Sequence, residues 1–588
     1  MTASKRNRSR RVTVSTFLVF AVVAVFVARL VDVQVIRAST LTTDALGKRS
    51  IGETVSGDRG EILDADGTVL AGTVLRYDIT AVPRFAAGAT TTDSHGVTTT
   101  TSRSELVGKI AEATGGDAAT MMTALTLDPT ANYAVLVKGV GVDALNAVNA
   151  LKISWVYPVR NSGRTYPRGA VAGNLVGFVG TDGAQAGLEY AYDSCLAGTD
   201  GTETYERGAD GVKLPGSTVV SKKAVAGGTL MTTIDSDLQY LVQQSLATHA
   251  KELGAASATA VVVKVADGTL KAVADYPSVD PNDVDGTDAN HLGSKAFTDL
   301  YEPGSTFKAM TAASLLDAGV ATTASRATVP DHRYFPWGGV IGDAESHPVE
   351  NLTLAGVLAN SSNVGISLLG EKLTPKQRYE YMLKFGLGST TDAKFPGEPT
   401  QALRPSSEWD HQTDYNSMFG QGVSATAIQT AGIYQTLANG GVRVPLSLVS
   451  GCRLPDGTVV DAPTTTGTRV VSRKAADDVV DMLENTIPEG TLRGMTPISG
   501  YNVAAKTGTA QVAKAGGGGY GSDFIISVAG IAPAEKPQYV VLVTFTKPTT
   551  KKTSFAASPA FREIISEVLE TYRVRPSTTP RTDLPDTW

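Results

Sequence analysis

The sequence is poor in cysteine and histidine. Only two cysteines, Cys195 and Cys452, and six histidines occur among 588 residues. The two cysteines lie far apart in the chain and we expect them in different domains, so the sequence predicts no disulfide framework even in an oxidising compartment. The histidines show no metal-ligand spacing. We therefore expect neither a metal site nor a cofactor.

A clustered basic face is also missing. The formal net charge is −6, and removing five positive charges near the N-terminus leaves −11 for the remainder. This mild acidity argues against nucleic acid as a partner, because nucleic-acid-binding proteins carry a basic patch. The rest of the composition, 42% hydrophobic and 19% charged, is that of a globular protein. At this length the chain should divide into two or three domains.

One long apolar run stands near the N-terminus, from Val12 to Ala28. Its length is at the short end for a membrane-spanning helix. Five basic residues precede it: Lys5, Arg6, Arg8, Arg10 and Arg11. They predict a cytoplasmic N-terminus, with everything after about residue 38 outside. A cleaved signal peptide is the alternative, but no A-x-A site closes the run, so we favour a retained anchor.

A Ser-x-x-Lys motif follows the helix-breaking pair Pro303-Gly304. Apolar residues then recur at helical spacing, so the Ser305 hydroxyl and the Lys308 amine should lie side by side in a first helical turn. Unpaired backbone N–H groups favour negative charge there. A neutral lysine, its pKa lowered by desolvation or a nearby cation, can take the proton of a serine nucleophile. An isolated motif of this kind is more often a helix-start serine beside a solvent-facing lysine.

Two later motifs change that balance. Ser361 and Asn363 form Ser-x-Asn, and Lys506, Thr507 and Gly508 form Lys-Thr-Gly, followed by Thr509. Ser361 alone could be a helix N-cap. The order and separations of the three motifs nevertheless match the set of penicillin-binding proteins and serine β-lactamases. No other serine in the chain has lysine three residues on, which argues against coincidence.

Between these landmarks the pattern predicts alternating strands and helices. We expect short strands around the Asp66-Gly67 turn, a surface loop at 90–101, and a structural ion pair between Arg164 and Glu189. In the second half we expect a hairpin formed by 258–264 and 270–274, and a helix after Ser305 at 307–316. Three strands should follow at 502–512, 524–531 and 538–546, and a last amphipathic helix at 557–572. The glycine-rich stretch 515–521 lacks the lysine of a phosphate-binding loop.

The chain resembles the class B penicillin-binding proteins, which are membrane-anchored peptidoglycan D,D-transpeptidases. Besides the three motifs, the resemblance is carried by Arg59-Gly60-x-Ile62-x-Asp64, Tyr166-Pro167, Gly187-Leu188-Glu189, Tyr301-Glu302-Pro303-Gly304 and Phe419-Gly420-Gln421-Gly422. The last of these resembles the division-type members more than the elongation-type ones. No glycosyltransferase segment of the bifunctional class is apparent.

The resemblance implies an α+β multidomain fold. It comprises a cytoplasmic tail and transmembrane anchor at 1–38, a mixed α/β pedestal, or dimerisation-like domain, at 39–225, and a transpeptidase domain at 226–573. That last domain would be of the penicillin-binding and serine β-lactamase type, an antiparallel sheet flanked by helices. The segment 574–588 is rich in proline and threonine, and its composition predicts disorder.

The resemblance also implies a role for each motif residue. Ser305 would attack the D-Ala-D-Ala carbonyl, Lys308 would take its proton, and Lys506 would be a second cation that holds Lys308 neutral. Ser361 would relay a proton to the leaving D-Ala, and Asn363 would orient Lys308 and the substrate amide. The remaining roles concern substrate: Thr507 and Thr509 for the terminal carboxylate, Gly508 for close approach, and the N–H groups of Ser305 and Thr509 for the oxyanion.

Stem peptides of peptidoglycan and β-lactams would then be the ligands. The expected protein partner is a glycan polymerase of the shape, elongation, division and sporulation (SEDS) family, with other division membrane proteins, at the septum. A β-lactamase lacks the anchor and pedestal, and a β-lactam sensor would need signalling helices that the sequence does not show. A scaffold of the division machinery with a weak site, and an elongation-type transpeptidase, are the alternatives.

Overall fold

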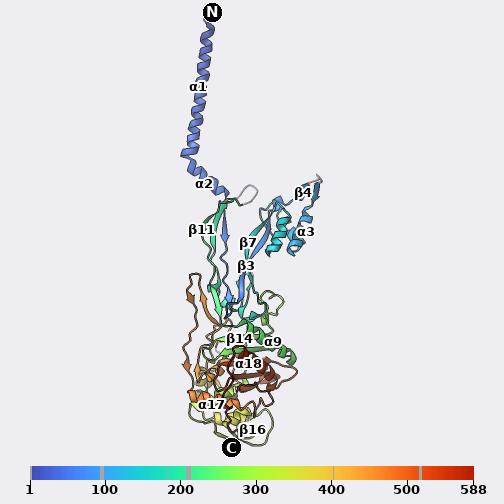
Figure 1. The fold of residues 1–588 in the computed structure, drawn as a ribbon, viewed down its shortest axis with the longest axis vertical. Coiled ribbons are helices and arrows are strands. Elements are labelled where there is room, and N and C mark those ends of the chain that lie inside the picture. The colour runs from blue at the N-terminus through green and yellow to red at the C-terminus, as the bar shows by residue number, and fades with distance from the viewer. Residues whose placement is uncertain (1–2, 93–97, 181, 207–212, 401–402, 515–518) are drawn as a thin grey trace. The chain divides into compact units, whose positions relative to one another are not determined.

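The computed structural model describes residues 3–92, 98–180, 182–206, 213–400, 403–514 and 519–588 (Figure 1). The chain divides into two compact units. The first is Met1–Asp58 with Gly198–Ala226, and the second is Arg59–Ala197 with Gly227–Trp588. The domain boundaries expected at residues 38, 225 and 573 remain predictions.

The first unit contains the apolar N-terminal helix. Helix α1 (Ala3–Val31) continues through a π-helical turn (Asp32–Ile36) into α2 (Ala38–Arg49). In the described part of the chain, Ser9–Ile36 is the one helix long and apolar enough to cross a membrane, and none of it is buried. Such a helix needs an apolar surrounding outside the protein, which suggests single-pass membrane anchoring. The unit is completed by a three-stranded antiparallel sheet of β1 (Ser50–Val55), β10 (Gly201–Glu206) and β11 (Val219–Lys222).

The second unit begins with the expected hairpin around Asp66-Gly67. Strands β2 (Ile62–Leu63) and β3 (Val69–Ala81) pair antiparallel, and the Asp64 carboxylate closes the turn by accepting from the N–H groups of Asp66 and Thr68. Strand β3 also pairs with β6 (Ala134–Val140) and β7 (Val156–Thr165). A core that includes Ile79, Ile110 and Trp155 fills the space between these strands and three helices: α3 (Arg103–Thr114), α4 (Ala118–Thr126) and α5 (Val142–Ala150).

The surface loop expected at 90–101 is instead part of a hairpin. Strands β4 (Ala89–Thr92) and β5 (Thr98–Thr101) pair antiparallel, and the residues between them, 93–97, lie outside the described residues. Threonine has high β-propensity, which the composition-based expectation of a loop ignored. Residues 515–518 of the glycine-rich stretch 515–521 also lie outside the described residues.

The ion pair expected between Arg164 and Glu189 is confirmed, with Nε 2.6 Å from the carboxylate. A second arginine, Arg59, binds the other oxygen of the same carboxylate at 2.6 Å and also pairs with Asp193. Glu189 is fully buried, so two guanidinium groups compensate its desolvation. The sequence interpretation found the pair but missed Arg59.

The two cysteines form a disulfide, so the prediction that they would not was wrong. Cys195 lies in the short helix α8 (Asp193–Leu196), and Cys452 lies in β20 (Val449–Arg453). Strand β20 pairs with β12 (Thr229–Thr232), placing Leu230 opposite Cys452, and Gly228 N donates to the Cys195 carbonyl at 2.8 Å. The cysteines are 257 positions apart in the sequence, and the pairing of β12 with β20 brings them together within the second unit.

This disulfide should stabilise the folded chain by about 2–4 kcal/mol, because it constrains a long loop of the unfolded chain. We expect reductant to lower the thermal unfolding temperature of the detergent-solubilised protein. The double variant Cys195→Ser/Cys452→Ser should unfold at that lower temperature with or without reductant. A wild-type protein whose unfolding is indifferent to reductant contradicts the expectation.

The catalytic half is built on a five-stranded antiparallel sheet in the order β14-β13-β25-β24-β23. The strands span Leu270–Tyr276, Ser257–Lys264, Tyr539–Thr546, Tyr520–Ala532 and Ala504–Ala513. Val262 of β13 joins one core cluster, with helices α9 (Ser236–Leu253) and α18 (Ser558–Thr571), while Val261 and Val263 join another, with α16 (Ala427–Ala438). Helices therefore cover both faces of the sheet, as the period-two alternation requires. The predicted fold class is confirmed.

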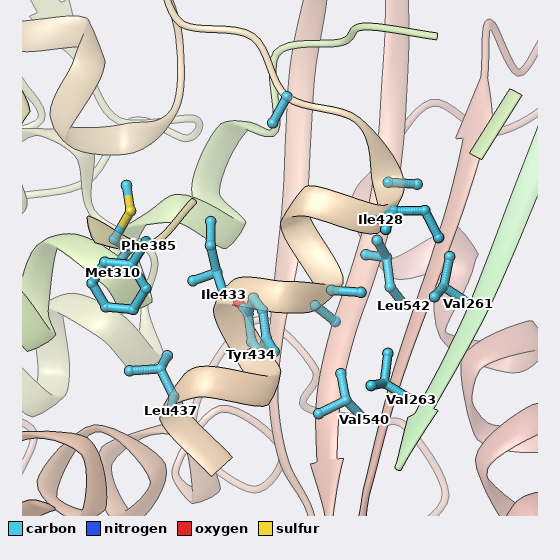
Figure 2. Close-up of a cluster of buried hydrophobic side chains, with 14 of the residues drawn as sticks. Val261, Val263, Met310, Phe385, Ile428, Ile433, Tyr434, Leu437, Val540 and Leu542 are labelled. Carbon is cyan, nitrogen blue, oxygen red and sulfur yellow. The ribbon is translucent and has the colours of Figure 1, made fainter. Parts of the chain in front are cut away.

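Helix α16 lies at the centre of the larger core. All of its residues are buried. Its side chains Ile433, Tyr434 and Leu437 lie between strand residues such as Leu542 on one side and Met310 on the other (Figure 2). The Tyr434 hydroxyl donates to the backbone carbonyl of Thr306 at 2.9 Å. This hydrogen bond attaches the segment that carries Ser305 to the buried helix α16.

The C-terminal segment 574–588 is not the disordered tail that its composition predicts. Thr353 N donates to the carbonyl of Asp586 at 2.9 Å, and Thr587 pairs with Leu352. The Asn485 amide donates to the Leu584 carbonyl at 2.7 Å. At the end of the chain, the Arg326 guanidinium stacks on Trp588, 4.7 Å from its ring centroid. Proline and threonine rule out a helix, but an extended segment can still dock through its backbone and one aromatic anchor.

Candidate active site

Ser305 lies in a turn ahead of a helix. The turn is a 3₁₀ segment, η4 (Gly304–Phe307), and α11 (Lys308–Asp317) follows directly. The expected helix exists, but Ser305 precedes it. In a 3₁₀ turn, residues i and i+3 eclipse each other, which still aligns Ser305 with Lys308. Ser305 is half-buried, whereas Lys308 is fully buried.

Two glycines allow this turn to touch strand β23. Gly304 has φ +58°, and a Cβ there would lie 2.5 Å from the Thr509 carbonyl oxygen. A Cβ on Gly508 would lie 2.9 Å from the Pro303 carbonyl oxygen and 2.4 Å from Ser527 Oγ. The sequence interpretation assigned Gly508 to close approach of substrate. The structure gives a different reason, since Gly508 makes room for the backbone of the Ser305 turn.

The Ser-x-Asn motif meets the same turn through Lys308. The Lys308 amine donates to the Ser361 carbonyl and lies 3.2 Å from Ser361 Oγ. Lys506 projects from β23, fully buried, close enough to Lys308 for the two charges to interact. Among the described residues, neither amine hydrogen-bonds the Ser305 hydroxyl, a looseness common in unliganded sites. The structure thus brings Ser305, Lys308, Ser361 and Lys506 together.

Burial controls the charge of both amines. Desolvation lowers the pKa of Lys308 to about 7, against the opposing charge of Asp343. Desolvation also lowers the pKa of Lys506, and the positive charge of Lys308 lowers it further. Burial is thus the largest cause of the lowered pKa of each amine. The sequence interpretation made Lys506 the cation that keeps Lys308 neutral, but the structure assigns that effect to burial.

Ser361 has the left-handed backbone conformation, with φ +58°. The N-cap of the following helix, α13 (Asn363–Gly370), is its neighbour Ser362, whose hydroxyl accepts from Gly365 N at 2.7 Å. The N-cap alternative for Ser361 is therefore wrong, and its hydroxyl faces Lys308. The Asn363 amide donates to the Gly342 carbonyl at 2.9 Å. Ser361, rather than Asn363, orients Lys308 in this structure.

Asp343 was missed by the sequence interpretation. It follows β17 (Val340–Gly342), and its carboxylate accepts from Ser362 Oγ at 2.6 Å and Val364 N at 3.0 Å, and from Asn363 N. No motif marks this aspartate, because its role depends on a hairpin bringing it to the start of α13. In the sequence, nothing distinguishes Asp343 from the acidic residues that lie at the surface.

The two threonines of the Lys-Thr-Gly-Thr segment differ in exposure. Thr507 is buried, and its hydroxyl donates to Thr491 Oγ1 at 2.8 Å, whereas Thr509 is exposed. Thr491 N in turn donates to the Ala359 carbonyl at 3.1 Å, at the end of α12 (Leu354–Ala359). Thr491, which the sequence interpretation did not identify, thus connects β23 to the helix that leads into Ser-x-Asn.

The Phe419–Gly422 segment packs against the other side of the Ser305 turn. Gly304 N donates to the Gly420 carbonyl at 2.9 Å. The Glu302 carboxylate accepts from Gly422 N at 3.0 Å and from the Tyr520 hydroxyl at 2.9 Å, and burial raises its pKa. Glu302 and Tyr520 therefore fix the approach to Ser305 from two elements.

Within the described ranges, no group of three or more histidine, cysteine, aspartate or glutamate side chains is placed to hold a metal ion. The chemistry of the site rests on a hydroxyl and two amines. A half-exposed serine beside a buried lysine with a pKa near 7 is the arrangement of a serine nucleophile with its base. These residues therefore form a candidate active site for acyl transfer.

Comparisons with known proteins agree. Residues 258–566 match the family model for the penicillin-binding protein transpeptidase domain, and residues 54–232 match that for the penicillin-binding protein dimerisation domain. Penicillin-binding protein PbpB of Mycolicibacterium smegmatis is 34% identical, over 98% of this chain and 91% of its own. Peptidoglycan D,D-transpeptidase FtsI of Escherichia coli is 31% identical, over 77% of this chain and 74% of its own.

Solved structures show the same likeness. Penicillin-binding protein 3 of Mycobacterium tuberculosis, solved in complex with aztreonam, superposes with a TM-score of 0.68 at 28% identity, covering 91% of this chain and 100% of its own. The chain belongs to the class B penicillin-binding proteins, the peptidoglycan D,D-transpeptidases.

Proposed function

We propose that this chain cross-links the stem peptides of peptidoglycan through an acyl-enzyme on Ser305. The observation that carries the proposal is the meeting of three distant segments: the Ser305 turn, Ser361 and Lys506 surround one buried amine, that of Lys308. A lysine with a pKa of about 7 is largely neutral slightly above neutral pH and can then accept the serine proton.

In the acylation step, Ser305 Oγ attacks the carbonyl of the penultimate D-Ala while Lys308 takes the hydroxyl proton. The tetrahedral oxyanion would be held by the N–H groups of Ser305 and Thr509, each donor contributing about 3–4 kcal/mol. The C–N bond to the terminal D-Ala then breaks, and the proton passes from Lys308 through the Ser361 hydroxyl, 3.2 Å away, to the leaving nitrogen. An amine from a second stem peptide resolves the ester and regenerates Ser305.

The substrate carboxylate would bind along β23. Thr509 is the exposed hydroxyl of that segment, whereas Thr507 is already bonded to Thr491. Thr509 therefore receives the larger share of the role that both threonines were expected to have. Asn363, half-buried and fixed by the Gly342 carbonyl, can turn its amide oxygen to the substrate peptide N–H.

The setting of this activity is also a proposal. The basic residues before the apolar helix place the N-terminus in the cytoplasm and the catalytic half outside. Relatives named FtsI and PbpB support a role in septal wall synthesis. A relative solved in complex with aztreonam supports β-lactams as inhibitors. A SEDS-family glycan polymerase and other division membrane proteins are the partners that this role requires.

Labelling with a fluorescent penicillin tests the proposed chemistry. The full chain in detergent should bind the label covalently and in a one-to-one ratio. Incubation with a D-Ala-D-Ala stem peptide and an acceptor amine should release D-Ala and form the cross-linked product. Folded protein that neither labels nor releases D-Ala contradicts the proposal and favours a scaffold without catalytic activity.

A further inference from the structure

The Asp343 carboxylate has all of its hydrogen-bonding capacity in use. One oxygen accepts from the N–H groups of Asn363 and Val364, and the other accepts from Ser362 Oγ at 2.6 Å and lies 3.0 Å from His347 Nε2. Its side chain is only 8% exposed. A carboxylate with four such contacts is held firmly in one position. Three of the four come from the Ser-x-Asn motif or the residue after it.

His347 is held in an orientation that favours a cation. Its Nδ1 lies 2.7 Å from the Pro348 carbonyl oxygen, and its Nε2 faces the Asp343 carboxylate. Both neighbours only accept hydrogen bonds, so the two contacts together favour the protonated imidazolium, in which both ring nitrogens donate. Although burial lowers the pKa of His347, these hydrogen bonds raise it above its ordinary value. The Asp343–His347 pair is therefore a compensated pair of charges.

The motif that Asp343 holds is under backbone strain. Ser361 adopts a left-handed conformation, which is uncommon and unfavourable for a residue with a side chain. The same residue carries both oxygens that receive the Lys308 amine. Asp343 fixes the two residues after Ser361, and Gly342 fixes the Asn363 amide. Such strain persists only where surrounding contacts determine the conformation, as they do here.

Asp343 also acts on Lys308 through its charge. The charged groups that face Lys308 are Asp343, from the loop after β17, and Lys506, from β23. Those that face His347 are Asp343, Glu350 at 3.9 Å, and Asp331. Asp343 opposes the effect of burial on Lys308 and keeps part of the amine population protonated. His347 partly neutralises Asp343 and so limits that effect.

We propose that Asp343, clamped by His347, is a positioning residue that holds Ser361 and Asn363 in place beside the Lys308 amine. The inference rests on the proposed acylation of Ser305 assisted by neutral Lys308. Asp343 touches neither substrate nor the reacting hydroxyl. It acts through its hydrogen bonds to the Ser-x-Asn motif and through the effect of its negative charge on Lys308.

The variant Asp343→Asn separates the charge from the contacts. An asparagine oxygen can still accept from Asn363 and Val364, and its NH₂ can face Ser362 and a neutral His347. Loss of the negative charge lowers the pKa of Lys308. The pH at half-maximal acylation by a fluorescent penicillin should therefore fall by about one unit, while the plateau rate at high pH stays within about threefold of wild type.

His347→Gln should move the profile the other way. Without the imidazolium the charge of Asp343 is uncompensated, so the midpoint should rise by about half a unit. Asp343→Ala removes the carboxylate contacts with Ser362, Asn363 and Val364, and it should lower the plateau rate at least about tenfold. The matched control is Asp410→Asn, because Asp410 caps another helix, α15 (His411–Asn416), through Thr413 N and does not bond to the motif; it should leave the midpoint unchanged.

The outcomes separate the two proposals. Opposite midpoint shifts in Asp343→Asn and His347→Gln support the inference, because a purely structural role would change rates without moving the midpoint. Unshifted midpoints in folded variants of a protein whose wild type labels normally overturn the inference and leave the acylation proposal intact. His347→Gln keeps the contacts of Asp343 with Ser362, Asn363 and Val364. Its midpoint therefore decides whether the inference holds if Asp343→Asn does not fold. A wild type that does not label overturns the proposed function itself, and the inference with it.

Discussion

Replacing Ser305 by alanine is expected to abolish covalent labelling by a fluorescent penicillin, with acylation slowed by more than about 10⁴-fold. The reason is chemical, since alanine offers no oxygen to form the acyl-enzyme, and the Ser361 hydroxyl is engaged with the Lys308 amine. Labelling of the purified full chain, read by gel fluorescence and by the mass of the adduct, measures the effect.

The fold should survive this substitution. Ser305 Oγ has no hydrogen bond to another described residue, so its loss leaves no partner unsatisfied. Ser314→Ala is the matched control, because Ser314 lies in α11, the helix that follows Ser305, is buried, and its hydroxyl bonds only the Met310 carbonyl among the described residues. It should label like wild type. Labelling of Ser305→Ala at the wild-type rate, with an unchanged unfolding temperature, would refute the nucleophile assignment.

The sequence allowed the meeting of the three motifs to be predicted because each is a short local pattern. Ser305 and Lys308 are three residues apart, and the helical periodicity after them fixes their alignment. Lys506 lies on a strand whose alternation places its side chain. What joined these segments was the resemblance to a family, and the geometry of the sheet then supplied the physical reason in Gly304 and Gly508.

The features that the sequence analysis missed depend on tertiary pairing. Cys195 and Cys452 meet because β12 and β20 pair, which sequence separation could not reveal. The C-terminal segment docks because Thr353 and Asn485 offer hydrogen bonds to its backbone, although its composition alone suggests disorder. Asp343 acquires its role only when a hairpin carries it to the start of α13. In each case a distant element determines the outcome.

The assignment of charge to the two lysines failed for a related reason. A motif shows that two amines are near one hydroxyl but does not show how deeply each is buried. Full burial of both Lys308 and Lys506 makes desolvation the largest effect on each, larger than their mutual repulsion. Burial is therefore the main reason that Lys308 can be neutral at the pH of the reaction, and that can be tested.

Lys308→Met is expected to lower the acylation rate by about 10²–10⁴-fold, the usual contribution of a general base. Methionine matches lysine in length and fills the same buried space without an amine. In the wild type, the rate should increase roughly tenfold per pH unit below about 7 and level off above it, because neutral Lys308 is the reactive form and its pKa is about 7. The pH profile of labelling by a fluorescent penicillin measures both effects.

Lys506→Met then distinguishes the two accounts of the lysine pair. If Lys506 were the cation that holds Lys308 neutral, its removal would raise the pKa of Lys308 and move the midpoint of the profile upward. Burial is the largest cause of the lowered pKa of Lys308, and it remains when Lys506 is removed. The plateau rate should therefore fall while the midpoint stays near 7. An upward shift of a full unit would return the cation role to Lys506, and burial alone would no longer explain how Lys308 becomes a base.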